Sequence, residues 1–392
     1  MPRHTPDATT FDSVLELLNE NGFEGLASAA ELLLNEAMRL ERSNYLGAGA
    51  YERGPERRGH ANGYKPKAVK TRLGKLSLSV PKVRGVADGA EPFYPNALEV
   101  GERSERALKC ALAEMYVQGV STRKVAAITQ ELCGFDVSSS QVSRATKLLD
   151  EELEAWRNRP LGRTAYLVLD ATYCKVRHGG QVIDCAVLIA IGVNAKGKRS
   201  ILGCSVSLSE AEVHWREFLQ SLVSRGMHGV RMVTSDDHAG LRAALRAVLT
   251  PNPWQRCQFH LQQNAGAYVA RTEDRPAVAA DIRAINNAPT REEAQRLLEL
   301  AAEKWRPKAP KLAEWMLENI PEGFTVMAED PQVRRRLRTS NMNERLNKEI
   351  KRRTRVATLF PNEASLLRLV TAILAEVSEE WETGRAYLQI QP

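Results

Sequence analysis

Hydrophobic runs between residues 164 and 207 predict three β-strands joined by short turns. The first run carries Asp170 in its middle, the second, Val182–Val193, is almost wholly apolar, and the third covers Ser200–Ser207. Gly179-Gly180 and Ala195–Lys198 supply turn residues between the runs. A three-stranded antiparallel meander is therefore expected.

The elements that follow predict an α/β core with helices inserted into it. We expect a helix at Glu210–Arg225, a strand ending at Asp236 and a helix from Gly240. Between residues 264 and 321 no strand pattern appears, and amphipathic helices are expected at 276–286, 290–305 and 308–319. Two last helices are predicted at Asn341–Arg353 and Glu363–Trp381.

The first 100 residues predict helices followed by a basic hairpin. Residues 12–42 have helical periodicity, and their apolar face would pack within the monomer or against a second copy. Residues 45–65 are rich in Gly, Arg and Pro and are typical of a loop or linker. In the segment 69–84, Leu76 and Leu78 alternate with serines, which indicates a half-exposed strand or hairpin.

Residues 103–158 look helical throughout and contain a helix-turn-helix pattern. The helix 121–132 precedes a Cys-Gly turn, and a second helix is expected at Val137–Leu149, opened by serines that can cap it. The alternative is an ordinary helical hairpin. In a helix-turn-helix, the second helix would present four polar side chains to DNA: Ser139, Gln141, Arg144 and Lys147.

Charge favours a polyanionic partner. The 392 residues carry a net charge of +7, and basic residues cluster at Arg57–Arg84, Arg334–Arg338 and Lys348–Arg355. A solvated basic face is the alternative explanation for any one cluster. No apolar stretch long enough for a membrane span and no signal peptide is evident. The six cysteines form no Cys-x-x-Cys pair, so most are expected to be small buried side chains in a reducing cytoplasm.

The two strand aspartates predict a metal site. A carboxylate buried in an apolar strand is costly unless it is compensated, and a divalent cation with oxygen ligands would compensate it. Asp170 and Asp236 occupy strand positions that could be neighbours in one sheet. In a basic protein this pattern points to phosphodiester chemistry driven by metal ions.

A third carboxylate is expected from Glu344. It shares one face of the helix 341–353 with Asn347, Lys348 and Lys351, which would place a metal ligand beside phosphate-binding cations, with Arg352 next to them. The alternative is a solvated helix in which Glu344 pairs with Lys348. Glu349 is a competing acid on another face.

Other residues around Asp236 leave alternatives open. Asp237 follows it directly and could be the ligand instead, although adjacent strand residues face opposite ways. Cys257 and His260 form a Cys-x-x-His pair without a second pair nearby, so a zinc ribbon is not expected. We expect a structural Cys257 and place His260 near the reacting phosphate, with a satisfied core histidine as the alternative.

Several segments together resemble the bacterial insertion-sequence transposases of the Mutator superfamily from about residue 58 onward. The segments that carry the resemblance are 166–173 (YLVLDATY), 235–241 (SDDHAGL), 256–260 (RCQFH), 338–347 (RTSNMNERLN), 352–362 (RRTRVATLFPN), Asn62-Gly63-Tyr64, Thr71–Gly74 and Val80–Arg84. A small neutral residue looks more usual in that superfamily than Asp237 after the second aspartate.

The resemblance implies an RNase H-like catalytic domain of α/β class, interrupted by an all-helical insertion, with the catalytic triad Asp170, Asp236 and Glu344. It also raises the expectation that His260 acts near the DNA. The expected regions are an N-terminal helical region for dimerisation (1–60), a basic hairpin or linker (61–100), a helix-turn-helix DNA-binding region (101–160), the first part of the core (161–260), the insertion (261–332) and the C-terminal core helices (333–392).

The implied activity is metal-dependent cleavage and strand transfer at terminal inverted repeats of double-stranded DNA. Mg²⁺ is the expected ion, with Mn²⁺ as a substitute. Pairing of two ends requires a homodimer or higher oligomer, and the expected location is the bacterial cytoplasm, at the nucleoid. The alternatives are an inactive transposase serving as a DNA-binding regulator and a plain metal-dependent nuclease.

Overall fold

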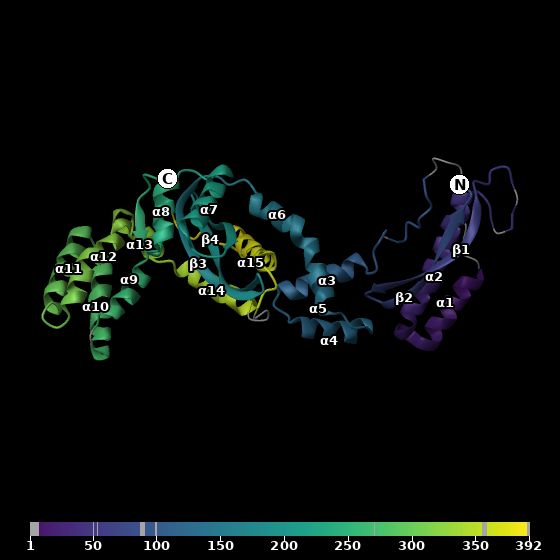
Figure 1. Ribbon diagram of the computed structural model, residues 1–392, viewed down its shortest axis with the longest axis horizontal. Helices are drawn as coiled ribbons and strands as arrows, with labels where there is room; N and C mark the ends of the chain where they lie inside the picture. Colours follow the sequence, from purple (N-terminus) through teal and green to yellow (C-terminus); the bar gives the residue numbers. More distant parts are fainter. Residues whose placement is uncertain are drawn as a thin grey trace. The chain divides into compact units, whose positions relative to one another are not determined.

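The computed structural model describes residues 8–49, 51–52, 54–86, 91–98, 100–269, 271–354 and 359–389. The chain forms two compact units (Figure 1). The first unit comprises residues 1–116 and 120–148, and the second comprises residues 117–119 and 149–392.

The first unit begins with two helices and a β-hairpin. The helices are α1 (Ala8–Asn21) and α2 (Leu26–Leu46), and the hairpin pairs β1 (His60–Thr71) with β2 (Gly74–Arg84). Leu76 and Leu78 are buried against Met38 of α2, while Ser77 and Ser79, which alternate with them, face solvent. The predicted hairpin is confirmed, and β1 begins inside the segment expected to be a loop.

The predicted helix pair of the first unit forms, with a shorter second helix than expected. After α3 (Arg106–Val117), α4 (Thr122–Cys133) ends at Gly134, whose φ of 70° suits glycine. Helix α5 covers only Ser139–Ala145, and a 3-10 turn, Thr146–Leu149, takes the place of its expected last turn. The Thr146 hydroxyl donates to the carbonyl of Ser143 at 2.8 Å there, a local bond that competes with regular helix.

A mixed five-stranded sheet forms the centre of the second unit. The strands are β3 (Thr164–His178), β4 (Gln181–Asn194), β5 (Arg199–Ser207), β6 (Met232–Ser235) and β7 (Trp254–Arg256), in the order β5-β4-β3-β6-β7. The first three are antiparallel, which confirms the predicted meander. Strands β6 and β7 add in parallel beside β3. Strand β7 was not predicted, because its three residues are too few for a clear hydrophobic pattern.

Helices cover both faces of this sheet. Helices α7 (Glu212–Ser224) and α8 (Ala239–Val248) bury one face against Leu167 and Leu169 of β3. Helix α15 (Glu363–Thr383) packs on β5, where the hydroxyl of Ser378 accepts from the Ile201 amide at 3.0 Å. Helix α6 (Asp150–Asn158) lies beside α15. Since side chains alternate along a strand, Asp170 lies on the face opposite to Leu167 and Leu169.

A helical bundle separates β7 from the C-terminal helices, as predicted. It contains α9 (Gln258–Ala265), α10 (Arg275–Asn286), α11 (Arg291–Trp305) and α12 (Pro310–Asn319). These helices share their own apolar core and lie together at one end of the second unit (Figure 1). Helices α13 (Pro331–Leu337) and α14 (Asn341–Thr354) lead back to the sheet.

Two further features concern the described helices and the cysteines. None of the described helices has the length and apolarity needed to cross a membrane. Four of the six cysteines, at positions 174, 185, 204 and 257, are buried free thiols.

Candidate active site

Asp170 lies in the middle of β3 and faces α14. Its Oδ2 accepts a hydrogen bond of 2.8 Å from the side-chain amide of Asn347. Burial, reinforced by the nearby Asp236 carboxylate, raises the pKa of Asp170 to about 7, although the Asn347 bond opposes the rise. The predicted strand carboxylate is therefore present and partly buried, and one amide donor does not fully compensate it.

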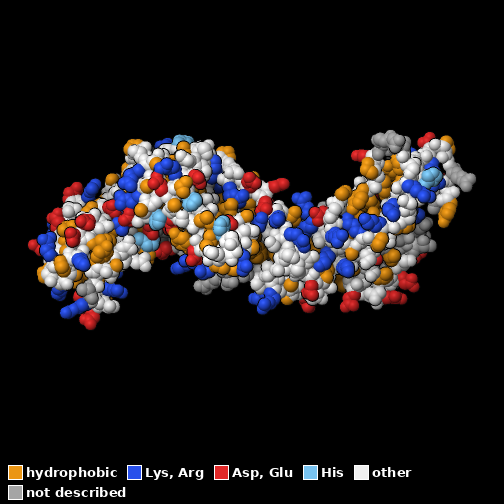
Figure 2. All heavy atoms as spheres, in the orientation of Figure 1, with side chains coloured by type: hydrophobic (Ala, Val, Ile, Leu, Met, Phe, Trp, Pro, Cys, Tyr) orange, Lys and Arg blue, Asp and Glu red, His pale blue; other side chains and the backbone are white. Residues whose placement is uncertain are grey.

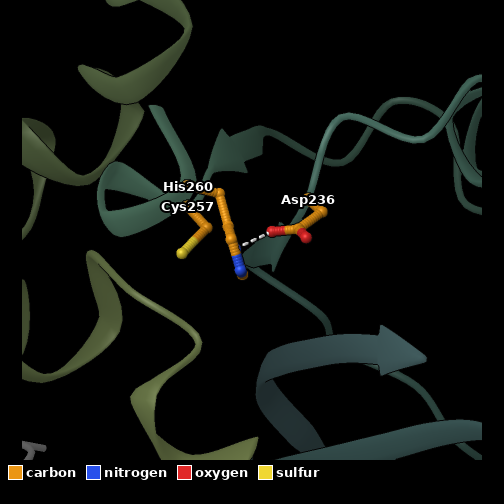
Figure 3. Close-up of side chains that lie close together, drawn as sticks. All are labelled: Asp236, Cys257 and His260. Atoms are coloured by element: carbon orange, nitrogen blue, oxygen red, sulfur yellow. Dashed lines mark ion pairs between the residues drawn. The ribbon is translucent and has the colours of Figure 1, made fainter. Parts of the chain in front are cut away.

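Asp236 follows β6, which is the parallel neighbour of β3, so the prediction that the two aspartates come from adjacent strands is confirmed. Its Oδ1 forms an ion pair with Nδ1 of His260, in the first turn of α9 (Figure 3). Burial alone would lower the pKa of His260, but Asp236 and Cys257 outweigh burial and raise it to about 10. His260 is therefore a cation that touches Asp236.

Cys257 connects three segments of the site. It precedes α9, and its amide donates to the Ser235 carbonyl at 2.8 Å, beside Asp236. Its Sγ accepts hydrogen bonds of 3.3 Å from the amide and from the hydroxyl of Ser340, directly before α14. Burial would raise the pKa of the Cys257 thiol, but hydrogen bonds from His260 and Ser340 lower it. Through these hydrogen bonds Cys257 joins the end of β6, the start of α9 and the start of α14.

Glu344 occupies the first turn of α14 and is partly buried. The structure has no ion pair between Glu344 and Lys348, two residues that it describes, so the solvated-pair alternative finds no support. Glu349, the competing acid, is held by Arg352 and Arg353, each at 2.7 Å. Hydrogen bonds from Arg352, then from Arg353, lower the pKa of Glu349 to about 2.

The three predicted triad residues are not the tightest potential metal cluster. Among the residues that the structure describes, the set with donor atoms all within 4.8 Å of one another is Asp236, Cys257 and His260. Asp170 and Glu344 fall outside this set. Asp170 is linked to α14 by the bond from Asn347.

Asp237 belongs to a charged network that does not include His260. Its carboxylate pairs with Arg242 at 3.0 Å and with buried Arg256 at 3.1 Å. Both arginines also pair with Glu322, at 2.8 Å and 2.9 Å. Asp237 therefore ties α8 and β7 to the end of the helical bundle, whereas Asp236 meets His260.

The residues expected to contact DNA lie in both units. In the first unit Ser139 and Arg144 on α5 are exposed, as is Lys147, which lies in the following 3-10 turn. The side chain of Gln141 is bound in a capping box, where its Oε1 accepts from the Ser138 amide at 2.9 Å. This bond engages the oxygen that was expected to read a base, so the prediction for Gln141 did not include its role as a helix cap.

In the second unit the expected DNA-contacting residues lie on α14. Lys348, Lys351 and Arg352 are exposed, and Arg352 is paired with Glu349. Figure 2 shows Lys and Arg side chains spread over the visible face and interspersed with Asp and Glu.

Two asparagines on α14 were missed as site residues. Asn343 is fully buried, and neither its amide nitrogen nor its amide oxygen has a hydrogen-bond partner. The Oδ1 of Asn347 is also buried without a partner. Such orphaned groups cost about 1–3 kcal/mol each. The signal in the sequence was their spacing of four residues, which places both on one face of α14.

These groups fit a hard divalent cation. Asp170 and Asp236 provide carboxylate oxygens, and the orphaned oxygen of Asn347 lies on the residue that contacts Asp170. Oxygen donors are the ligands that Mg²⁺ prefers. A cation at this place would also relieve the cost that raises the pKa of Asp170.

Asp237→Asn tests which of the two adjacent aspartates binds the cation. The variant weakens the pairs with Arg242 and Arg256, so we expect a loss of about 1 kcal/mol in the free energy of unfolding. Stabilisation by Mg²⁺ in thermal unfolding should persist in this variant and disappear in Asp236→Asn. If Mg²⁺ instead stabilised Asp236→Asn and not Asp237→Asn, Asp237 would be the ligand.

Comparison with known proteins places these features in context. The family model "Transposase, Mutator family" matches residues 8–384. The chain is 55% identical over 388 residues to the transposase for insertion sequence element IS406 of Burkholderia multivorans, covering 98% of this chain and 99% of the relative. It is 41% identical to the transposase for ISRM5 of Rhizobium meliloti, covering 98% and 96%. The transposase for IS256 in transposon Tn4001 of Staphylococcus aureus is 36% identical, covering 91% of each chain.

Proposed function

Because this chain belongs to the Mutator family of transposases, we propose that it cleaves DNA at the terminal inverted repeats of its element and joins the freed 3′ ends to target DNA. The observation that carries the proposal is the partly buried Asp170, which lies on the strand next to that of Asp236 and whose raised pKa a nearby cation would lower. A site of this kind suits phosphodiester chemistry at neutral pH.

The proposed catalytic domain is RNase H-like. Three antiparallel strands followed by two parallel strands, with helices on both faces, support this assignment. The proposed all-helical insertion corresponds to the bundle between β7 and α13, which has its own core. The first unit contains the proposed dimerisation and DNA-binding regions, including the helix-turn-helix formed by α4 and α5.

Asp170, Asp236 and Glu344 are the proposed ligands of the divalent cations. When bound, Mg²⁺ would lower the pKa of the attacking water or 3′-hydroxyl and would neutralise the charge that develops on the leaving oxygen. Asn347 holds the Asp170 carboxylate in one orientation. His260 does the same for Asp236 and provides a positive charge beside the DNA phosphate. No covalent intermediate between protein and DNA is required.

The exposed cations of α14 are proposed to hold the DNA backbone beside this centre. Lys348 and Lys351 lie on the helix that carries Glu344, so a phosphate bound by them lies near the proposed ligands. Phosphate contacts of this kind fix the register of DNA without reading its sequence.

A combined cleavage and joining assay tests the proposed activity. With Mg²⁺ and labelled repeat-end DNA, the protein should nick the repeat end and should join precleaved ends to a plasmid. Cleavage without joining would indicate the plain nuclease. Specific binding with neither reaction would indicate the inactive regulator.

Arg144→Ala tests the proposed base readout by α5. Arg144 is exposed on the second helix of the pair, so its loss should reduce the preference for repeat DNA over random DNA. A lost base contact costs about 1–3 kcal/mol, which corresponds to roughly a 5- to 150-fold loss of preference in a competition binding assay. An equal loss on both DNAs would make Arg144 a phosphate contact instead.

The proposed dimer uses α1 and α2. Several large apolar side chains in and between these helices are exposed, namely Phe11, Leu15, Phe23, Leu32 and Leu33. Exposed apolar side chains of this kind favour association, and strand transfer requires two paired ends. Light scattering of the purified chain measures the oligomeric state directly.

A further inference from the structure

Asp236, Cys257 and His260 form a compact set of metal-binding donors that magnesium chemistry does not explain. A carboxylate oxygen, a sulfur and an imidazole nitrogen lie within 4.8 Å of one another. Figure 3 shows the His260 ring directed toward Asp236, with Cys257 beside it. The set is assembled from the end of β6 and from the start of α9.

The donor types select a particular class of ion. Sulfur and imidazole nitrogen are poor ligands for Mg²⁺, which prefers oxygen. Zn²⁺ binds Cys, His and Asp together, and three protein ligands leave a fourth position for water. The side chains of Asp236 and His260 are 38% and 26% exposed, so solvent and an ion can reach the site.

Ser340 supplies the outer support that metal-bound thiolates need. Its amide and hydroxyl both donate to the Cys257 sulfur at 3.3 Å. Outer hydrogen bonds of this kind orient a ligand and stabilise its charge. Since Ser340 directly precedes α14, an ion bound to Cys257 would also hold the start of the helix that carries Glu344.

We propose that Asp236, Cys257 and His260 form a zinc site that shares Asp236 with the magnesium site. Zn²⁺ bound there removes a carboxylate from the magnesium set, so zinc inhibits cleavage by competing for Asp236. The inhibition rests on the proposed function, whereas zinc binding itself does not.

Co²⁺ is the probe for binding, because it substitutes for zinc and absorbs light when bound to thiolate. Addition of Co²⁺ to the full-length protein without DNA should give a sulfur-to-cobalt charge-transfer band that added Zn²⁺ abolishes. Cys257→Ser should lose the band. His260→Gln should weaken Zn²⁺ binding by roughly 100-fold, because losing a ligand should cost at least as much affinity as losing a residue that only hydrogen-bonds to a ligand.

Two matched cysteine variants serve as controls. Cys185→Ser removes another buried thiol, and Cys110→Ser removes the exposed one, and both should retain the band. Circular dichroism verifies that Cys257→Ser is folded, and His260→Gln gives an independent reading that keeps the thiol. Cobalt binding without a charge-transfer band, or a band that persists in Cys257→Ser, would overturn the zinc site.

Inhibition is measured separately. Zn²⁺ should inhibit Mg²⁺-supported cleavage by the wild-type protein at concentrations at least tenfold below those needed for Cys257→Ser, which keeps the proposed magnesium ligands. A protein that shows the cobalt band but never cleaves DNA would refute the proposed function and leave the zinc site standing. Equal inhibition of the two proteins would refute the sharing of Asp236.

Discussion

Asp170→Asn, Asp236→Asn and Glu344→Gln will each reduce repeat-end cleavage by roughly 10³-fold or more. Each substitution removes one proposed ligand of an ion whose charge stabilises the transition state by several kcal/mol, and each 1.4 kcal/mol is tenfold in rate. Binding to repeat DNA should remain nearly intact, because none of the three supplies the proposed base contacts. Cleavage on labelled repeat DNA with Mg²⁺ measures the first effect, and a mobility-shift assay measures the second.

Neighbouring acids provide matched controls for these variants. Asp237→Asn and Glu349→Gln remove carboxylates that are adjacent in sequence but are paired with arginines. Both should retain cleavage within about tenfold of wild type, which corresponds to at most about 1.4 kcal/mol. If Glu344→Gln also stayed within tenfold while Glu349→Gln lost activity, the third ligand would be Glu349.

Asp170→Asn should stabilise the metal-free protein, by an amount that depends on pH. The folded-state pKa of about 7 lies above the ordinary aspartate value of about 3.9. The contribution of Asp170 to stability is therefore most favourable below about pH 4, and this contribution is lost as pH rises from about 4 through 7. About three pKa units correspond to a ceiling of about 4 kcal/mol above pH 7. The variant cannot ionise and should avoid this loss.

Thermal unfolding in a chelating buffer at pH 4 to 8 measures this difference. The two proteins should be similar in stability near pH 4, and the variant should be more stable near pH 8. Mg²⁺ should stabilise the wild type at pH 8 and have little effect on the variant, since the ion replaces the missing compensation. If the difference in stability between the wild type and Asp170→Asn did not change with pH, the pKa of Asp170 would not be raised in the folded protein.

Much of the second unit could be predicted from the chain because its signals are local. The apolar runs of β3, β4 and β5 and the turns between them lie in consecutive residues. The adjacency of Asp170 and Asp236 followed from two strands of one sheet, and the structure confirms it. The bundle helices α10 to α12 begin and end within a few residues of their expected bounds.

The contacts inside the site could not be predicted because they join segments that are distant in sequence. Ser340 meets Cys257 across 83 residues, and Asn347 meets Asp170 across 177. The network that engages Asp237 depends on Glu322, which the helical bundle brings to the sheet. Helix α5 was expected to be longer. Hydrophobic periodicity gives no sign of the hydrogen bond from the Thr146 hydroxyl to the Ser143 carbonyl, which competes with regular helix.

The most direct test of the account is a crystal structure of the full-length protein with repeat-end DNA and Mn²⁺, in which anomalous scattering locates the ions. The account predicts manganese bound by carboxylate oxygens of Asp170, Asp236 and Glu344, at about the 2.1 Å typical of such hard cations. Ions held by the two aspartates, with the Glu344 carboxylate turned away from them, would contradict it.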